Sequence, residues 1–517
     1  MPRHVLTAES DTLPTIDSII TRAAKVSPNQ IAVREWGGQE ITYAELDSAV
    51  SSFAAWARSQ GTQAGDAIAI HLPNSIAFLV AQFGSFRAGA VATYVSYRLT
   101  PNEAQRQFAL SRARIVVTTP AKATELRKDP AFVNTVIVVD GPGSEHSHSL
   151  TDVIAARLLP DFTTEGLEDS DAIIRFTSGS TGDPKGLIVT HRAWLIRAMS
   201  LLIEELDIRQ GSTTLLLGQL SHQAGLFVIP TFMRSGTLLV QEKFSLDTVA
   251  EILETQPISC AQIVPTMFTL MLNHARAREA LAKSRMHRIV YGGSPIRQSV
   301  LAEVMGVLPM TEFVQAYGSH EAGSISVLTG TAHRDPKLQH SAGHPFLPVQ
   351  LRLNAPNADG VGEIEVKSPW LPNARLTPQG REEITEKWSR TGDLGEVIDG
   401  YIYLRDRMND MIISGGFNVY PVEVEKVIGS HPQVLDVAVA SAPDDKWGER
   451  VIAFVVPRAP GTFNEEGMRE YCKTQLAGYK VPKEFHLIAE MPLNVNGKPD
   501  RRSLAQPHWA GRQRRIN

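Results

Sequence analysis

The sequence contains only two cysteines, Cys260 and Cys472, in 517 residues. Two thiols are too few for a disulfide framework or a thiolate zinc site, which fits a reducing cytoplasm. No apolar run approaches the roughly 18 residues of a membrane span, because Arg87 interrupts the nearest one, 76–94. The first residues include Glu9 and Asp11 and have no apolar core, so they do not predict a secretory signal. We therefore expect a cytoplasmic protein without a membrane segment.

The sequence also lacks a strong charge of either sign. Its 51 basic and 55 acidic side chains give a formal net charge of −4, which gives no reason to expect binding to nucleic acid or to an anionic membrane. The chain exceeds what one hydrophobic core usually supports, so we expect at least two domains. A local basic tail near the C-terminal end is interpreted as solvated: Arg501, Arg502, Arg512, Arg514 and Arg515.

Short apolar runs alternate with helical patterns over the first three-fifths of the chain. Helices begin at two capping boxes, Thr42–Glu45 and Thr100–Glu103. This alternation predicts an α/β protein whose stacked α/β layers contain a parallel sheet. The runs that are typical of buried strands are 66–72, 114–117, 135–139, 214–217, 237–240 and 288–291.

The pattern changes in the second part of the chain. From about residue 324 to 404 it is β-rich, and residues 362–366 alternate as a half-exposed strand does. A smaller α+β unit follows Arg407. We therefore predict a large N-terminal domain, 1–408, with a β-rich subdomain, and a small C-terminal domain, 409–517. The elements expected in the small domain are helices at 421–428 and 464–476 and strands at 434–440, 451–456 and 484–488.

The segment from Arg175 to Gly186, RFTSGSTGDPKG, indicates a phosphate-binding loop. Glycines let backbone N–H groups approach an anion, hydroxyls add donors, and Lys185 adds a cation. The spacing matches neither GxxxxGK[ST] nor GxGxxG. Composition of this kind also occurs in surface linkers, so the loop depends on other motifs for support.

Four such motifs follow in order: QAYGSHE at 315–321, SRTGDLG at 389–395, DRMNDMIISGGFN at 406–418 and NVNGK at 494–498. Together with the loop they resemble the adenylate-forming superfamily of acyl- and aryl-CoA synthetases, nonribosomal adenylation domains and beetle luciferases. The resemblance covers nearly the whole chain, and five motifs in the right order leave little room for chance. It implies a mobile small domain and activation of a carboxylic acid by ATP and Mg²⁺, followed by transfer to a thiol such as coenzyme A.

The resemblance implies roles for the motif residues. Tyr317 stacks on adenine, Asp393 accepts hydrogen bonds from the ribose hydroxyls with help from Arg407, and Glu321 and Thr181 hold Mg²⁺. Taken alone, Asp393 would be an ordinary turn residue, Tyr317 a packed aromatic and Glu321 a solvated acid. The full set implied for ATP and AMP is Thr177, Ser178, Gly179, Ser180, Thr181, Gly182, Lys185, Gly293, Ser294, Pro295, Tyr317, Gly318, Asp393 and Arg407.

The implied catalytic residues are Lys498, Glu321, His320 and Lys185. In the family the lysine at the position of Lys498 bridges the attacking carboxylate and the phosphate. His320 is a departure, because relatives mostly carry Thr or Ser there. Asn409 occupies the position of the domain hinge, where relatives have Asp or Lys, and asparagine tolerates the unusual dihedrals of a hinge.

The implied acyl pocket is apolar or small-sided, which suits a hydrophobic acid better than an amino acid. The aspartate that anchors amino acids in relatives is missing at 220–222, and His222 matches a pocket histidine, although a lone histidine is more often structural. The pocket residues are His222, Val264, Phe268, Tyr291, Gly292 and Ala316.

The acyl acceptor stays open at this stage. CoA is preferred to a carrier-protein thiol for two reasons. Gly415 and Gly416 resemble the border of a pantetheine tunnel, and aromatic and basic residues suit a nucleotide. Trp447 would, however, equally well close the small domain's core. A stand-alone adenylating enzyme that passes acyl-AMP to a partner, and a non-catalytic nucleotide-binding member, are alternatives; luciferase-like oxidation is a remote third. We expect a monomer or a homodimer. The remaining CoA candidates are Tyr479, Lys480, Lys483 and Arg98.

Overall fold

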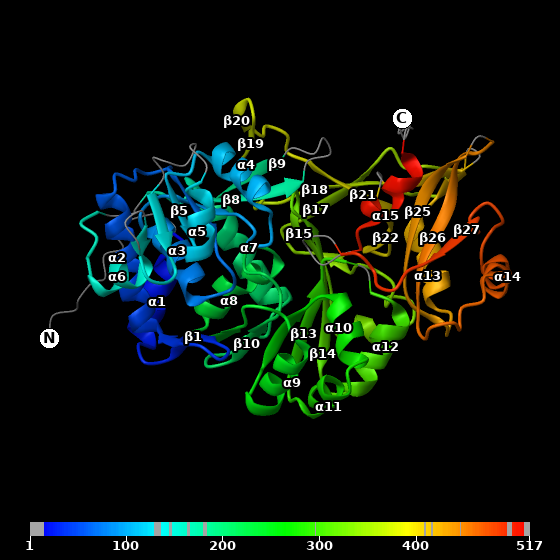
Figure 1. Ribbon diagram of the computed structural model, residues 1–517, viewed down its shortest axis with the longest axis horizontal. Helices are drawn as coiled ribbons and strands as arrows, with labels where there is room; N and C mark the ends of the chain where they lie inside the picture. The colour runs from blue at the N-terminus through cyan, green and yellow to red at the C-terminus, as the bar shows by residue number, and fades with distance from the viewer. Residues whose placement is uncertain are drawn as a thin grey trace.

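The computed structural model describes residues 15–128, 136–143, 147–162, 166–178, 184–294, 296–407, 410–414, 417–444, 446–493 and 499–510. Most of the chain forms a large body, and the segment coloured orange to red forms a smaller one at the opposite side from the N-terminus (Figure 1). No helix within these residues has both the length and the apolar character that crossing a membrane requires.

Two nine-stranded sheets with parallel centres form the large body. The first has the order β16 (His344–Pro345), β15 (Gly323–Leu328), β14 (Glu312–Ser319), β13 (Arg288–Gly292), β12 (Cys260–Ile263), β10 (Thr213–Leu216), β11 (Thr237–Val240), β1 (Ile31–Glu35) and β2 (Glu40–Thr42). The second has the order β20 (Gly380–Glu383), β19 (Ala374–Thr377), β9 (Pro184–Thr190), β8 (Asp171–Ser178), β4 (Val91–Tyr94), β3 (Ala67–His71), β5 (Ile115–Thr118), β6 (Val136–Val139) and β7 (His148–Ser149). All six predicted strands of this region are present.

Helices cover and join the two sheets. Both predicted capping boxes are confirmed, at Thr42 and Thr100. One large core contains residues of both sheets and of α2, α3, α7 and α8, and a second core packs the first sheet against α9 to α12. The helices are α1 (Ser18–Val26), α2 (Tyr43–Ser59), α3 (Ile76–Arg87), α4 (Pro101–Ser111), α5 (Pro120–Leu126), α6 (Leu150–Ala155), α7 (His191–Glu204), η2 (Gln223–Phe227), α8 (Val228–Met233), α9 (Leu246–Thr255), α10 (Pro265–Leu272), α11 (Ala275–Lys283), α12 (Gln298–Val307) and η3 (Ala332–Arg334).

The β-rich subdomain is an antiparallel sheet of β17 (Gln350–Asn354), β18 (Gly362–Lys367), β21 (Ser389–Ile398) and β22 (Tyr401–Arg407). Residues 362–366 form a strand as predicted, but the prediction that this strand is half-exposed was wrong. Glu363 and Glu365 are only 5% and 6% exposed. Arg390 and Arg352 on the neighbouring strands form ion pairs with these two carboxylates and cover them. Paired charges can thus be buried where an unpaired carboxylate would not be.

The small domain has its own core, separate from those of the large body. The end of α13 lies against the large domain, since a Cβ on Gly429 would be 3.1 Å from the Arg297 side chain. The predicted boundary at residue 409 stays a prediction, because 408 and 409 are outside the described residues. The elements of the small domain are β23 (Ile412–Ser414), β24 (Phe417–Val419), α13 (Pro421–Gly429), β25 (Val434–Asp444), β26 (Gly448–Pro457), α14 (Glu465–Gln475), β27 (Glu484–Leu487), α15 (Arg501–Ala505) and η4 (Gln506–Trp509).

Candidate active site

The predicted phosphate loop joins two neighbouring antiparallel strands. β8 leads into it and β9 leaves it, with Thr177 opposite Lys185 in the register. The loop is therefore a hairpin connection, and it does not open a helix as phosphate loops of the Walker type do. Lys185 lies at the start of β9 and is half-buried. Residues 179–183, namely Gly179, Ser180, Thr181, Gly182 and the aspartate that follows, and the side chains of Thr177 and Ser178 are outside the described part.

Tyr317, near the end of β14, meets Asp393 in the middle of β21. The Tyr317 hydroxyl donates a hydrogen bond of 2.7 Å to Oδ2 of Asp393, whose residue is only 7% exposed. The backbone N–H of Asp393 donates to the Thr391 hydroxyl oxygen, and Gly392 between them has φ +73°. Asp393 is thus a buried, oriented carboxylate and not a solvated turn residue. Arg407 is its backbone neighbour on β22, although the arginine side chain is outside the described part.

The glycines after β13 allow close approach of a backbone and a side chain. A Cβ on Gly292 would be 2.2 Å from the carbonyl oxygen of Ala316, its partner on β14. Gly293 has φ +83°. The Gln223 side chain lies against both glycines, with Nε2 3.0 Å and Oε1 2.8 Å from where their Cβ atoms would be. Sequence reasoning missed Gln223, and its only signal was its place directly after His222.

His222 and His320 lie near each other although they come from different elements. Their ring centroids are 6.2 Å apart. Nδ1 of His222 also lies 2.8 Å from the Ser221 hydroxyl oxygen, which fixes the ring at the start of η2. The structure therefore brings together the predicted pocket histidine and the histidine that departs from the family pattern.

The six predicted acyl-pocket residues do not share one face of the first sheet. Phe268 and Tyr291 are fully buried in the core against α10 and α12, with their rings 6.1 Å apart. The Tyr291 hydroxyl also contacts Gln315 at 3.0 Å and His333 at 2.9 Å. Gly292 follows Tyr291 in β13 and so faces the opposite side, as does its neighbour Ala316. Val264 is half-buried just before α10. A pocket role for Phe268 and Tyr291 stays a prediction.

Glu321 lies on the turn between β14 and β15, directly after His320, and its side chain is exposed. An accessible carboxylate fits Mg²⁺, which binds few protein ligands and keeps several of its waters. Gly318 is exposed in β14, and Ser294 is half-buried just after β13, the neighbouring strand. Pro295 lies outside the described residues.

Three predicted CoA residues of the small domain are exposed, namely Trp447, Tyr479 and Lys483, and Lys480 is half-buried. Trp447 is 45% exposed, so it does not close the core, and Lys446 lies 4.6 Å from the centre of its ring. Asp444 accepts hydrogen bonds from the backbone N–H groups of both residues, which fixes the turn. Lys480 forms an ion pair of 2.6 Å with Glu423.

The other CoA candidates are spread over both domains. Lys483 is exposed, and Tyr479 is 36% exposed next to Lys480. Arg98 is exposed in the large domain, where it and Tyr97 line a cavity of about 80 Å³. Lys498, Asn409, Gly415 and Gly416 are outside the described residues.

The chain on both sides of residues 494–498 is tied down. Leu493 pairs with Pro499, and the Asp500 N–H donates a 2.8 Å hydrogen bond to the Pro492 carbonyl. Arg501 forms ion pairs with Glu425 and Asp410 at 2.6 and 3.2 Å. The segment next to the predicted catalytic lysine is therefore attached to the small domain.

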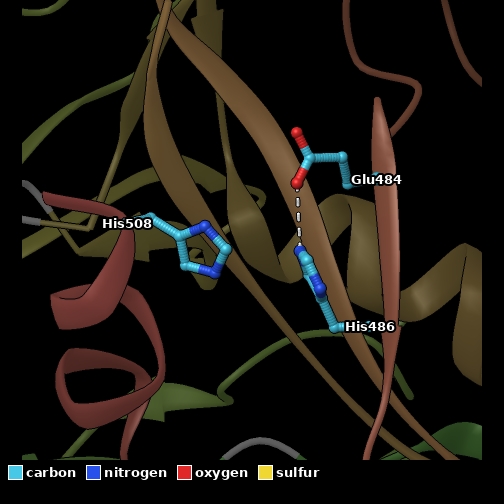
Figure 2. Close-up of side chains that lie close together, drawn as sticks. All are labelled: Glu484, His486 and His508. Carbon is cyan, nitrogen blue, oxygen red and sulfur yellow. Dashed lines mark hydrogen bonds and ion pairs between the residues drawn. The ribbon is translucent and has the colours of Figure 1, made fainter.

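Glu484, His486 and His508 form a separate polar cluster on the small domain (Figure 2). Their metal-type ligand atoms all lie within 4.8 Å of one another, and Nε2 of His486 is 3.1 Å from Glu484. Glu484 already has an ion pair of 2.8 Å with Arg450. Burial and the neighbouring His486 lower the pKa of His508. We interpret the cluster as a contact that fixes η4 on β27, separate from the motif residues.

Comparison with protein families agrees with this geometry. The family model described as AMP-binding enzyme matches residues 20–373, and the model described as AMP-binding enzyme C-terminal domain matches residues 423–498. The first match covers more than half of the chain. The chain therefore belongs to the AMP-binding enzymes, the adenylate-forming superfamily of ligases.

Among relatives with curated names are acyl- and aryl-CoA ligases. The chain is 32% identical to a feruloyl-CoA synthase of Amycolatopsis sp, over 92% of this chain and 96% of the relative. It is 31% identical to the fatty acid–[acyl-carrier-protein] ligase ScoC of Streptomyces coeruleorubidus, over 93% of this chain and 94% of the relative. The names of these two relatives thus give different acyl acceptors, CoA for the first and an acyl-carrier protein for the second.

Solved structures confirm the predicted fold class. The amide bond synthetase McbA from Marinactinospora thermotolerans superimposes with a TM-score of 0.81 at 26% identity, covering 95% of this chain and 99% of that chain. The o-succinylbenzoate CoA synthetase MenE from Bacillus subtilis, in complex with its acyl-adenylate intermediate, gives 0.80 at 25% identity, covering 94% and 97%.

Proposed function

We propose that this protein is an AMP-forming acyl-CoA synthetase. It activates a hydrophobic carboxylic acid with ATP and Mg²⁺ to acyl-AMP and pyrophosphate, and then transfers the acyl group to CoA. The observation that carries the proposal is the Tyr317–Asp393 pair. It offers an aromatic ring and a buried, oriented acceptor, and Glu321 lies on the turn that directly follows the strand of Tyr317.

In the first step the acid's carboxylate attacks the α-phosphorus of ATP, and pyrophosphate leaves. The main barrier is electrostatic, because two anions must meet and a third must depart. The loop at 177–185 holds the β- and γ-phosphates, Asp393 accepts from the ribose hydroxyls, and Lys498 bridges the carboxylate and the α-phosphate. Glu321 holds Mg²⁺, which supplies charge neutralisation when bound.

In the second step a thiol displaces AMP from the acyl-adenylate. Trp447 and Lys446 support CoA as the thiol, because an exposed indole beside a cation suits a nucleotide that carries phosphates. A second candidate is a stand-alone adenylating enzyme with a protein or amine acceptor, and the carrier-protein ligase and the amide bond synthetase among the similar proteins favour keeping it.

One experiment separates these possibilities. Pyrophosphate release is measured across a panel of aliphatic and aromatic acids, with and without CoA, and thioester is assayed in parallel. Thioester formation with CoA supports the ligase. Pyrophosphate release and retained acyl-AMP without thioester favour the adenylating enzyme, whereas no pyrophosphate release with any acid contradicts the proposal.

A further inference from the structure

Arg175 and Arg197 are two buried arginines that none of the predicted roles uses. Arg175 lies on β8 and Arg197 on α7, and they are 7% and 6% exposed. Both guanidinium groups lie over the ring of Trp194, with Cζ atoms 5.6 and 5.3 Å from its centroid. Trp194 and Arg197 are three positions apart on α7, so they share a face of that helix.

These two cations are poorly neutralised. Arg197 donates one hydrogen bond, from Nε to the Ser324 hydroxyl oxygen at 3.0 Å. The Arg175 side chain makes no hydrogen bond or ion pair with any residue in the described ranges. Two carboxylates attract these cations electrostatically without forming an ion pair with them. Glu321 acts on Arg175 in this way, and Glu205 acts on Arg197.

Both groups stay charged at neutral pH. Burial lowers the pKa of the Arg175 guanidinium. Burial, followed by repulsion from Arg175, lowers the pKa of Arg197 to about 9, which is still above neutrality. A buried cation without a partner is costly, and stacking on one indole offsets only part of that cost.

A third unsatisfied donor lies beside Arg175. Tyr94 on β4 is its partner in the parallel register. The Tyr94 hydroxyl is buried and has no hydrogen-bond partner in the part of the chain that the structure describes. Burial raises the pKa of this hydroxyl, so it keeps its proton and can donate it to an acceptor.

The group is next to the candidate active site. Arg175 is two residues before Thr177, where the phosphate loop begins. Arg197 lies under the turn that carries Glu321, because its Cζ atom is 3.6 Å from where a Cβ on Gly323 would be. Two cations and a hydroxyl donor thus lie near the strand that leads into the phosphate loop and near the Glu321 turn, and an oxyanion is a group that such donors bind.

We propose that Arg175, Arg197 and Tyr94 form an oxyanion-binding site for a reactant of this enzyme. This inference rests on the proposed function, since it takes the anion from one of the reactants. Two reactant groups have the required chemistry: the phosphates of ATP, and a second carboxylate on a dicarboxylic acid. A carboxylate is planar and a phosphate is tetrahedral, and a guanidinium group binds the oxygen atoms of either through paired N–H donors.

The test measures binding of four probes by calorimetry: ATP, inorganic pyrophosphate, adipate and hexanoate. Arg175→Met keeps the size of the side chain and removes its charge. Arg192→Met is the matched control, because Arg192 is on α7, the helix of Arg197, but pairs at the surface with Asp169. We expect Arg175→Met to weaken one class of oxyanion by at least about tenfold, and to leave the ligand-free Tm unchanged or raise it. Tyr94→Phe should weaken the same ligand to a smaller extent.

The pattern of loss identifies the source of the anion. Weaker binding of ATP and pyrophosphate, with the acids unaffected, assigns the site to the phosphates. Weaker binding of adipate, with hexanoate and ATP unaffected, assigns it to a second carboxylate. Affinities that match those of Arg192→Met for all four probes overturn the proposal, and so does a lower Tm with an equal loss for every probe.

Binding does not require turnover, so the two proposals fail separately. If the wild-type protein binds these anions through Arg175 but releases no pyrophosphate with any acid, the proposed function is contradicted while the anion site stands. If pyrophosphate release is normal and Arg175→Met binds like the control, only the anion site is contradicted.

Discussion

Tyr317 and Asp393 are 76 positions apart in the sequence, yet the tyrosine hydroxyl donates a 2.7 Å hydrogen bond to the aspartate. The bond sets the direction of a carboxylate whose residue is only 7% exposed. A carboxylate accepts hydrogen bonds only, so it suits the two hydroxyls of a ribose. The aromatic ring and the acceptor are thus fixed relative to each other before any nucleotide binds.

Asp393→Ala should chiefly weaken ATP binding. The ribose would lose its acceptor while the reacting phosphorus is untouched, so KM for ATP should rise by about tenfold or more with a smaller change in kcat. Tyr317→Phe keeps the ring and removes only the orienting hydroxyl, so its effect should be smaller. Initial rates of pyrophosphate release at varied ATP measure both. An unchanged KM in Asp393→Ala would return this residue to a structural role.

Lys498→Ala should abolish acyl-AMP formation in a protein that stays folded. The substitution removes a cation from a transition state that concentrates negative charge, which typically costs a factor of ~10²–10³ or more. Pyrophosphate release measures the loss, and circular dichroism checks the fold. Supplied acyl-AMP should still be converted with CoA. Adenylation close to the wild-type rate would contradict the assignment of Lys498.

Asn409→Pro should have the opposite effect on the two half-reactions. If the small domain rotates about this residue, proline fixes φ and one of the two domain orientations is lost. Acyl-AMP formation should be largely retained while thioester formation falls. Single-turnover assays of each half-reaction measure this. Equal loss of both steps in Asn409→Pro and in Lys498→Ala would mean that one orientation serves throughout.

His320→Thr should retain adenylation, because threonine offers the hydroxyl donor that relatives have at this position. His320→Ala removes the donor and should lower kcat/KM by about tenfold or more. Its ring is 6.2 Å from that of His222, so His222→Ala is the control for a loss that arises from the neighbouring ring. Equal activity of the threonine and alanine variants would show that the donor is not used.

Acidification should destabilise the large domain through His191. Burial lowers the pKa of His191 to about 4, and its Nδ1 accepts a hydrogen bond of 3.2 Å from the Ile16 N–H. The imidazole is neutral in the fold and takes up a proton on unfolding. Its stabilising effect is therefore present above about pH 6.5 and is lost at up to ~1.4 kcal/mol per pH unit as pH falls towards 4.

Urea unfolding at several pH values in this range measures the effect. His191→Gln does not titrate and keeps an acceptor for Ile16, so its free energy of unfolding should fall less steeply. Part of the slope should remain, since burial also lowers the pKa of His71 to about 4. Identical slopes for the variant and the wild type would contradict this account.

Local signals predicted the secondary structure well. Capping boxes at Thr42 and Thr100 depend on residues three positions apart, and buried strands such as 237–240 depend on short apolar runs. Exposure was harder to predict. The alternation at 362–366 gives the two faces of a strand, but whether Glu363 and Glu365 reach water depends on arginines from other strands.

Contacts between distant residues could not be predicted from the sequence. Nothing near Asp393 indicates that Tyr317 bonds to it, and Trp447 could be placed at the surface only by the structure. Arg175 had a signal that was not used. It is a charged residue directly after the apolar run Ala172–Ile174 and before Phe176, and a buried charge in a strand requires an explanation.

The bridge between Leu493 and Pro499 brings the two ends of 494–498 together on the small domain. Arg501 ties α15 to α13 through Glu425, so the described chain on both sides of 494–498 is attached to the small domain. If Lys498 has the role that we propose, the position of the small domain decides how far this lysine lies from the nucleotide.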